Sequence, residues 1–138
     1  ETPNPIRAFF PPGSRTPMHA SGTGKAILAA LPAERRARLL PATGLTGFTA
    51  RTHVSLASLM ADLEATRARG WSFDRDERYE GMSCIGAAIF NDRGEPCAGI
   101  SISGPSARFA EDRLPGLGSA VVAAAHRITA RIAGDPAA

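Results

Sequence analysis

Apolar residues recur at helical spacing in three stretches of the chain. The first stretch follows Ser21, the second lies between Ser55 and Gly70, and the third begins at Glu111. Side chains three and four positions apart share one face of a helix, so each stretch forms an apolar stripe. Serine is favoured just before a helix and glycine just after one. The pattern therefore predicts three helices that each bury one face.

The segments between these helices have other patterns. Residues 83–90 form a mostly apolar run, which is typical of a buried strand, and residues 98–103 end in alternating isoleucine and serine. Residues 91–94 (Asn-Asp-Arg-Gly) are typical of a hairpin turn, so we expect the two strands to pair. We also expect a strand at residues 6–10, between prolines, and a short helix at residues 33–40.

Residues 18–26 (MHASGTGKA) lead from a polar turn directly into the first predicted helix. Ser21 can cap this helix, so the first free N–H groups should point out of the Gly22–Thr23 corner. Free N–H groups and the helix dipole attract a small anion. An ordinary capped helix whose N–H groups meet water is the alternative.

This turn does not match a nucleotide-binding P-loop. That motif requires a glycine where His19 stands and a serine or threonine where Ala26 stands. Gly22, Gly24 and Lys25 therefore favour an anion without specifying a nucleotide.

The composition indicates one globular domain. The chain has 138 residues, of which 43% are hydrophobic and 21% are charged, with a formal net charge of +3. The arginines, Arg36 among them, are spread through predicted helices, where we expect them to form solvated faces. Because they form no basic run, we expect no binding of DNA by this chain alone.

Cysteine content and hydropathy suggest the compartment. Cys84 and Cys97 are too few for a disulfide framework and lack zinc-site spacing, so neither a metal nor another cofactor is indicated. No stretch approaches the ~20 apolar residues of a membrane span, and no signal peptide is recognisable. We therefore expect a cytoplasmic protein that has no membrane partner. Because the chain begins with Glu1 and not Met, we also expect a fragment of a longer protein.

Two hydroxyls and a thiol are candidates for chemistry. Ser101 and Ser103 share one side of their strand, where they either face solvent or, if covered, bond to a ligand. Cys84 should lie on the neighbouring strand, where a cysteine is usually inert. Alternatively, Cys84 forms a nucleophilic pair with His19, oriented by Asp74, as in a cysteine-dependent enzyme.

Five motifs stand in a recognisable order along the chain. They are residues 17–26 (PMHASGTGKA), residues 69–74 (RGWSFD), Gly81 with Cys84, residues 88–90 (AIF) and residues 101–105 (SISGP). Together they resemble the C-terminal effector-binding domain of the IclR family of bacterial transcription regulators. The resemblance runs from about Pro12 to Ala133.

The resemblance implies an α/β (α+β) fold over residues 1–138, with a GAF- or profilin-like curved antiparallel sheet flanked by helices. It implies a non-catalytic domain that binds a small metabolite. From the donors around the site we expect this effector to be a small carboxylate, a 2-oxo or hydroxy acid such as glyoxylate or pyruvate. It further implies a homo-oligomer, dimer or tetramer, whose packing transmits occupancy to the DNA-binding domains. DNA would be bound only by an N-terminal winged helix-turn-helix domain, which we expect to lie outside this chain.

The resemblance also implies the residues of the effector site. They are the N–H groups of Gly22 and Thr23, the side chains of Asp74, Cys84, Ser101 and Ser103, and the walls Ala8, Thr16 and Met82. Amide donors, hydroxyls and a thiol can hold a carboxylate without a full positive charge. We expect Asp74 to accept a hydrogen bond from a hydroxyl, or a hydrated carbonyl, at the other end of the effector. A purely structural oligomerisation domain is the remaining alternative, and it predicts no internal polar pocket.

Overall fold

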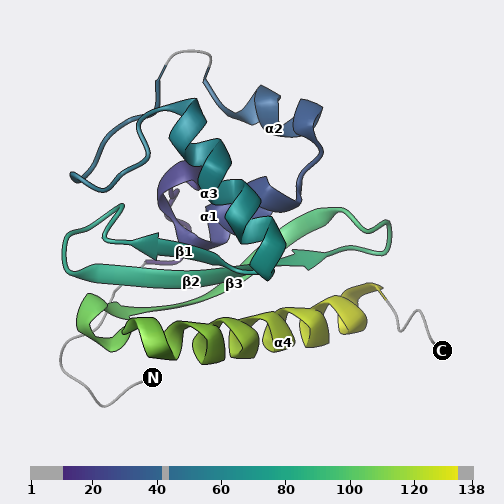
Figure 1. Ribbon diagram of the computed structural model, residues 1–138. Coiled ribbons are helices and arrows are strands. Elements are labelled where there is room, and N and C mark those ends of the chain that lie inside the picture. Colours follow the sequence, from purple (N-terminus) through teal and green to yellow (C-terminus); the bar gives the residue numbers. More distant parts are fainter. Residues whose placement is uncertain (1–10, 42–43, 134–138) are drawn as a thin grey trace.

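The computed structural model describes residues 11–41 and 44–133 (Figure 1). In chain order the elements are a 3-10 turn at Met18–Ala20, α1 (Gly22–Ala30), α2 (Ala33–Leu39), α3 (Leu56–Arg69), β1 (Ser72–Arg75), β2 (Met82–Phe90), β3 (Pro96–Pro105), 3-10 turns at Ser106–Arg108 and Glu111–Arg113, and α4 (Leu114–Ala133). The predicted helices and the predicted hairpin are confirmed. The strand predicted at residues 6–10 lies outside the described residues.

Local sequence explains where the helices begin and end. The hydroxyl of Ser21 accepts a hydrogen bond from the N–H of Gly24 at 3.1 Å and so caps α1, and Ser55 caps α3 in the same way. Gly70 ends α3 with a φ of 86°, a left-handed conformation that favours glycine. α4 begins later than predicted, because the residues from Glu111 first form a 3-10 turn.

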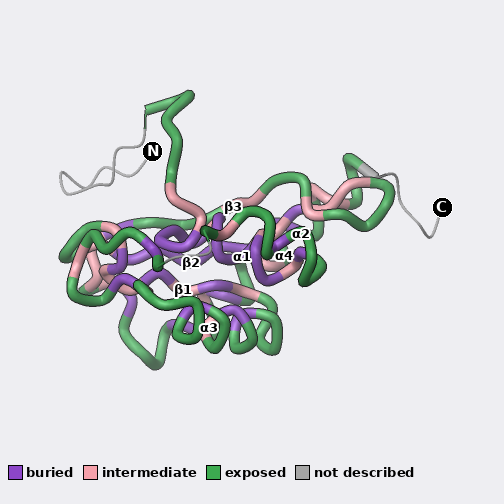
Figure 2. The backbone as a smooth tube through the Cα atoms, turned by 90° about the horizontal axis from the view of Figure 1, so that it is seen from above, coloured by how far each residue is buried: buried purple, intermediate pink, exposed green. Residues whose placement is uncertain are grey.

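The three strands form an antiparallel sheet in the order β1-β2-β3, and helices cover both of its faces (Figure 1). α4 packs on one face against β2 and β3, while α1 packs on the other face and in turn contacts α3. Figure 2 shows that buried residues concentrate on β2 and α1, at the centre of the molecule. The antiparallel sheet flanked by helices, which the resemblance implies, is confirmed.

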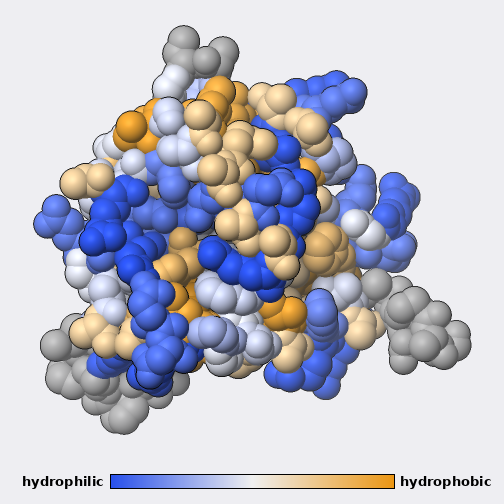
Figure 3. Space-filling model, viewed as in Figure 1, coloured by the Kyte–Doolittle hydropathy of each residue, from blue (hydrophilic) through white to orange (hydrophobic). Residues whose placement is uncertain are grey.

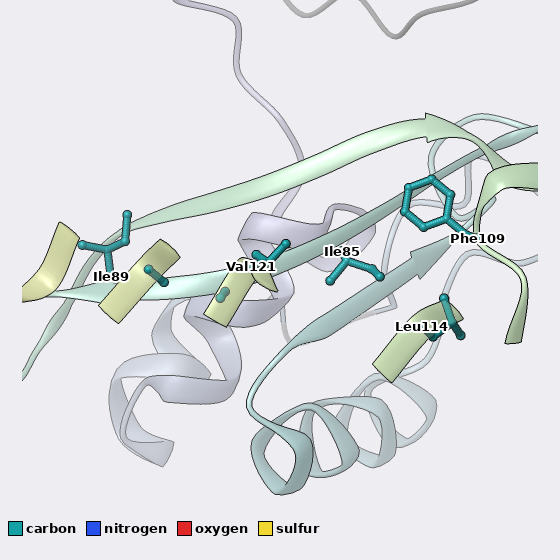
Figure 4. Close-up of a cluster of buried hydrophobic side chains, with 7 residues drawn as sticks. Ile85, Ile89, Phe109, Leu114 and Val121 are labelled. Atoms are coloured by element: carbon teal, nitrogen blue, oxygen red, sulfur yellow. The ribbon is translucent and has the colours of Figure 1, made fainter. Parts of the chain in front are cut away.

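Two clusters of buried apolar side chains form the core of the described residues. Ile85 and Ile89 of β2 point toward α4, where Val121 covers them, and Phe109 and Leu114 lie at one end of this cluster (Figure 4). A second buried cluster joins α1 to α3 and consists of Leu28, Ala29, Leu31, Leu45, Leu59 and Leu63. The first cluster therefore holds α4 against the sheet, and the second holds α1 and α3 together.

Arg36 contradicts the expectation that all the helical arginines form solvated faces. Its side chain is buried, and its Nη1 donates to the carbonyl oxygens of Leu28 and Leu31, at 3.4 Å each. The guanidinium therefore satisfies carbonyl groups at the C-terminal end of α1, where a positive charge is also favoured by the helix dipole.

The surface combines hydrophilic and apolar areas. Figure 3 shows hydrophilic side chains spread over the face seen in Figure 1, with apolar residues in patches between them. Within residues 11–41 and 44–133, no helix has both the length and the apolar character needed to cross a membrane.

Candidate functional site

A cavity of about 260 Å³ lies where the N-terminus of α1 meets the sheet. Eight of the nine predicted site residues line it: Thr16, Gly22, Thr23, Asp74, Met82, Cys84, Ser101 and Ser103. The ninth, Ala8, lies outside the described residues. Residues that are distant in sequence therefore converge on one cavity, to which several of them contribute polar groups. This cavity contradicts the alternative of a purely structural oligomerisation domain.

Two glycines allow α1 to reach the cavity. Gly22, the first residue of α1, lies against Gly86 of β2, where an added Cβ would stand 2.4 Å from the carbonyl carbon of Gly22. The first main-chain hydrogen bond of α1 runs from the N–H of Lys25 to the carbonyl of Ser21. The N–H groups of Gly22 and Thr23 therefore have no partner within the helix, and both residues line the cavity.

Three site residues form a row across the sheet. Cys84 of β2 pairs with Asp74 of β1 on one side and with Ser103 of β3 on the other. The Sγ of Cys84 lies 2.9 Å from the Oγ of Ser103. Ser101 lines the same cavity two residues along β3. Both serines also remain exposed, so the cavity opens to solvent along β3.

Asp74 is the buried carboxyl group of the site. Only 3% of the surface of Asp74 is exposed, and its Oδ1 accepts a hydrogen bond from the N–H of Glu77 at 2.8 Å. Burial raises the pKa of Asp74 to about 6, although the hydrogen bond from Glu77 opposes the rise. Asp74 is therefore ionised at neutral pH, but it protonates under mildly acidic conditions.

Cys84 has the environment of an inert thiol. Burial raises the pKa of Cys84 to about 11, despite the hydrogen bond with Ser103, so the thiol is protonated at neutral pH. His19 does not activate it, because its Nε2 donates to the carbonyl oxygen of Thr46 at 2.8 Å and its ring stacks on Phe48. The structure therefore does not form the nucleophilic pair that an enzyme would need.

The cationic residue that lines the cavity is Arg78 and not Lys25. Lys25 does not line the cavity; it is fully buried, and its Nζ contacts Glu77 and Asp62 at 2.7 and 2.8 Å. Arg78 lines the cavity instead, and its guanidinium carbon lies 3.8 Å from the centre of the Phe48 ring. The expectation that Lys25 attracts the anion is therefore wrong, and the cation at the cavity is one that the sequence analysis did not name.

Five residues that line the cavity were not predicted as site residues from the sequence: Ser14, Ala20, Ser21, Arg78 and Tyr79. Ser21 was recognisable only as a helix cap, because the same position serves both roles. Arg78 and Tyr79 lie in a charged stretch after β1 that has no periodicity. Among the described residues, no group of three His, Cys, Asp or Glu side chains is placed to hold a metal ion.

The described residues thus place a cavity lined by hydrogen-bond donors between the start of a helix and an antiparallel sheet, an arrangement that suits a small ligand. Residues 1–130 match the family described as "Bacterial transcriptional regulator IclR C-terminal". The chain belongs to the IclR family of bacterial transcriptional regulators and corresponds to its C-terminal, effector-binding domain.

Individual relatives agree with this assignment. The chain is 48% identical over 130 residues to the HTH-type transcriptional regulator BhcR of Paracoccus denitrificans (strain Pd 1222), a match that covers 94% of this chain and 46% of that protein. It is 46% identical over 124 residues to the transcriptional repressor IclR of Escherichia coli (strain K12), covering 90% of this chain and 45% of the repressor. The crystal structure of the Thermotoga maritima IclR superposes with a TM-score of 0.90 at 28% identity, covering 96% of this chain and 54% of that one.

The curated relatives are named as transcriptional regulators and repressors, and the chain spans about half of their length. As a member of this family, the chain is the C-terminal domain of a transcriptional regulator. The enzyme alternative based on Cys84 has no support.

Proposed function

We propose that this chain senses a small carboxylate effector, a 2-oxo or hydroxy acid of a few carbons such as glyoxylate or pyruvate. The proposed contacts of the effector are Gly22, Thr23, Asp74, Cys84, Ser101 and Ser103, and the proposed walls of the site are Thr16, Met82 and Ala8. The observation that carries the proposal is the convergence on one cavity of the first two residues of α1, whose N–H groups have no partner within the helix, with the Asp74–Cys84–Ser103 row. The intact regulator would act in the bacterial cytoplasm.

The donors around the cavity suit a carboxylate. The N–H groups of Gly22 and Thr23 stand at the positive end of the α1 dipole, and the hydroxyls of Ser101 and Ser103 can donate as well. Arg78 adds a positive charge to the same wall. A carboxylate in this cavity would therefore meet neutral donors and one guanidinium.

The remaining polar group of the effector is assigned to Asp74. An ionised carboxyl group repels a second anion and accepts hydrogen bonds from a hydroxyl. A hydroxy acid, or a hydrated 2-oxo acid, offers a carboxylate at one end and a donor at the other. The cavity of about 260 Å³ has the volume of about nine water molecules, which is enough for an acid of a few carbons.

The proposed output is a change in subunit packing. An effector that binds one arrangement of this domain more tightly than another shifts the population toward that arrangement. In a homo-oligomer of the intact regulator, dimer or tetramer, this shift would alter the spacing of the DNA-binding domains, which would lie N-terminal to the domain described here. By linkage, operator DNA must then change effector affinity by the same factor.

A thermal-shift screen tests the effector class. Sodium glyoxylate, sodium pyruvate, short dicarboxylates and aromatic acids are added separately to the chain and to the double variant Ser101→Ala/Ser103→Ala. At about a hundred times its Kd, a ligand that binds only the folded state stabilises it by about 2.7 kcal/mol. We expect a small 2-oxo or hydroxy acid to raise the Tm of the original chain but not that of the double variant.

Ser119→Ala, at an exposed position on α4, is the matched control and should respond like the original chain. A panel in which no small acid raises the Tm of the original chain would contradict the proposal. An equal rise in the Tm of the double variant would show that the acid binds at a site that does not include Ser101 and Ser103.

A further inference from the structure

A buried cluster of charges lies behind Asp74. Lys25 is fully buried, and its Nζ lies 2.7 Å from the Oε1 of Glu77 and 2.8 Å from the Oδ2 of Asp62. Two carboxyl groups thus face one ammonium group, and the Oε2 of Glu77 is buried without a hydrogen-bond partner among the described residues. A buried ion pair is costly to desolvate and is weak evidence of a stabilising role. A contribution to stability therefore does not by itself explain why these charges are buried here.

Glu77 connects this cluster to the cavity, although Glu77 itself does not line the cavity. Its main-chain N–H donates to the Oδ1 of Asp74 at 2.8 Å, and its side chain accepts from Lys25. Lys25 also donates to the carbonyl oxygen of Phe73, directly before Asp74, at 2.5 Å. Since Lys25 belongs to α1, the same contacts fix the Asp74 carboxyl relative to the free N–H groups of Gly22 and Thr23.

A second set of hydrogen bonds holds Glu77 from the other side. The hydroxyl of Thr52 donates to the carbonyl oxygen of Glu77 at 2.6 Å and accepts from the N–H of Thr49 at 2.9 Å. The hydroxyl of Thr49 donates to the carbonyl oxygen of Asp76 at 2.6 Å. The turn that carries Glu77 is therefore fixed through both its main chain and its side chain.

We propose that Glu77, anchored by Lys25, is a positioning residue of the effector site: it holds the Asp74 carboxyl at the cavity and sets the charge around it. The inference rests on the proposed function, because the geometry that Glu77 controls is that of the effector contacts. The role requires no contact between Glu77 and the effector.

The charged and titratable groups around Asp74 define what Glu77 contributes. Lys25 faces Asp74 from α1, Cys84 faces it from β2, and Asp76 and Glu77 follow it along the chain. Arg78 lines the same cavity. The negative charge of Glu77 favours the protonated form of Asp74, while the positive charge of Lys25 opposes this effect. His53 lies beyond Glu77, with its Nε2 3.6 Å from the Oε1 of Glu77.

Three variants separate positioning from general stability. Glu77→Gln keeps an acceptor for Lys25 but removes the charge. Glu77→Ala keeps the main-chain donor to Asp74 but removes the anchor. Asp62→Asn removes the other partner of Lys25 and leaves Glu77 in place, so it is the matched control. Each chain is titrated calorimetrically with sodium glyoxylate and with sodium pyruvate across a range of pH. The Asp74 carboxyl is also titrated without ligand by carbon-13 NMR.

We expect Glu77→Ala to weaken binding of the acid by about tenfold or more, a loss comparable to that of one well-formed hydrogen bond. Glu77→Gln should bind within about threefold of the original chain near neutral pH, while the midpoint of the Asp74 titration falls by about half a pH unit or more. Asp62→Asn should leave that midpoint in place.

If both Glu77 variants bind and titrate like the original chain, the inference is overturned. If Glu77→Ala does not fold, Glu77→Gln decides, and an unchanged Asp74 midpoint in that variant rejects the role. If neither acid binds the original chain while the Asp74 midpoint still moves in Glu77→Gln, the proposed effector class fails but the control of Asp74 by Glu77 stands.

Discussion

Gly22 at the start of α1 and Gly86 in the middle of β2 lie so close that a Cβ on Gly86 would stand 2.4 Å from the carbonyl carbon of Gly22. A Cβ on Gly22 would in turn stand 3.2 Å from the main-chain nitrogen of Gly86. The hydroxyl of Ser72 closes the same contact by donating to the carbonyl oxygen of Gly22 at 2.5 Å. This crossing of two glycines brings the free N–H groups of the helix to the row formed by Asp74 and Cys84.

Gly86→Ala should therefore damage both the fold and the site. The added methyl group meets main-chain atoms that cannot turn aside, so we expect a loss of about 1–3 kcal/mol in the free energy of unfolding. Urea denaturation measures this loss. Gly116→Ala on α4 is the control, because a Cβ there meets no atom within 4 Å. It should be neutral or stabilising by up to about 1 kcal/mol. Equal stability of the two variants would contradict the close approach of α1.

Asp74→Asn should stabilise the domain at neutral pH while it weakens effector binding. The pKa of Asp74 in the folded state, about 6, lies above its ordinary value of 3.8, so the folded state binds this proton more tightly than the unfolded state does. Ionised Asp74 thus lowers stability above about pH 6, by at most roughly 3 kcal/mol, and the penalty disappears as the pH falls below about 4.

Chemical denaturation near neutral pH and near pH 4 checks this prediction. The stability difference between Asp74→Asn and the original chain should be large at the higher pH and small at the lower one. A variant that is less stable than the original chain at neutral pH would show that ionised Asp74 contributes net stability instead.

Cys84 should resist alkylation. With a pKa of about 11, its thiolate fraction near pH 8 is on the order of one in a thousand, and the side chain is buried as well. Cys97 is exposed on β3 and serves as the internal control. Mass spectrometry of peptides after brief treatment with iodoacetamide should find Cys97 modified and Cys84 intact. Rapid modification of Cys84 would contradict the inert environment described here.

Lys25→Met should be strongly destabilising. It leaves the buried carboxyl group of Glu77 and the partly exposed carboxyl group of Asp62 without the ammonium group of Lys25, and breaking a buried ion pair in this way typically costs about 3–5 kcal/mol. The contrast is Arg35→Ala, which breaks the exposed contact between Arg35 and Glu95 and should cost less than about 1 kcal/mol. Thermal unfolding of the two variants under identical conditions measures the difference. Similar losses in both would mean that Lys25 is not the required counter-ion of the cluster.

The sequence by itself determined the elements whose causes are local. Helices begin after Ser21 and Ser55 and end at Gly70 because of hydrogen bonds and backbone conformations within a few residues. The turn at residues 91–94 joins strands that are adjacent in sequence. The resemblance to the IclR family joined the candidate residues of these patterns into one predicted site and added its walls, Ala8, Thr16 and Met82. Eight of the nine predicted site residues line the cavity, while Ala8 lies outside the described residues.

Only the tertiary structure decided where each charge lies. Lys25, Arg36 and Arg78 are all cations in polar stretches of the sequence, yet the first two are buried and the third lines the cavity. Their positions depend on partners far along the chain, such as Glu77 for Lys25 and Phe48 for Arg78. Desolvation and charge pairing act through space, so no local pattern could assign these roles before the chain was folded.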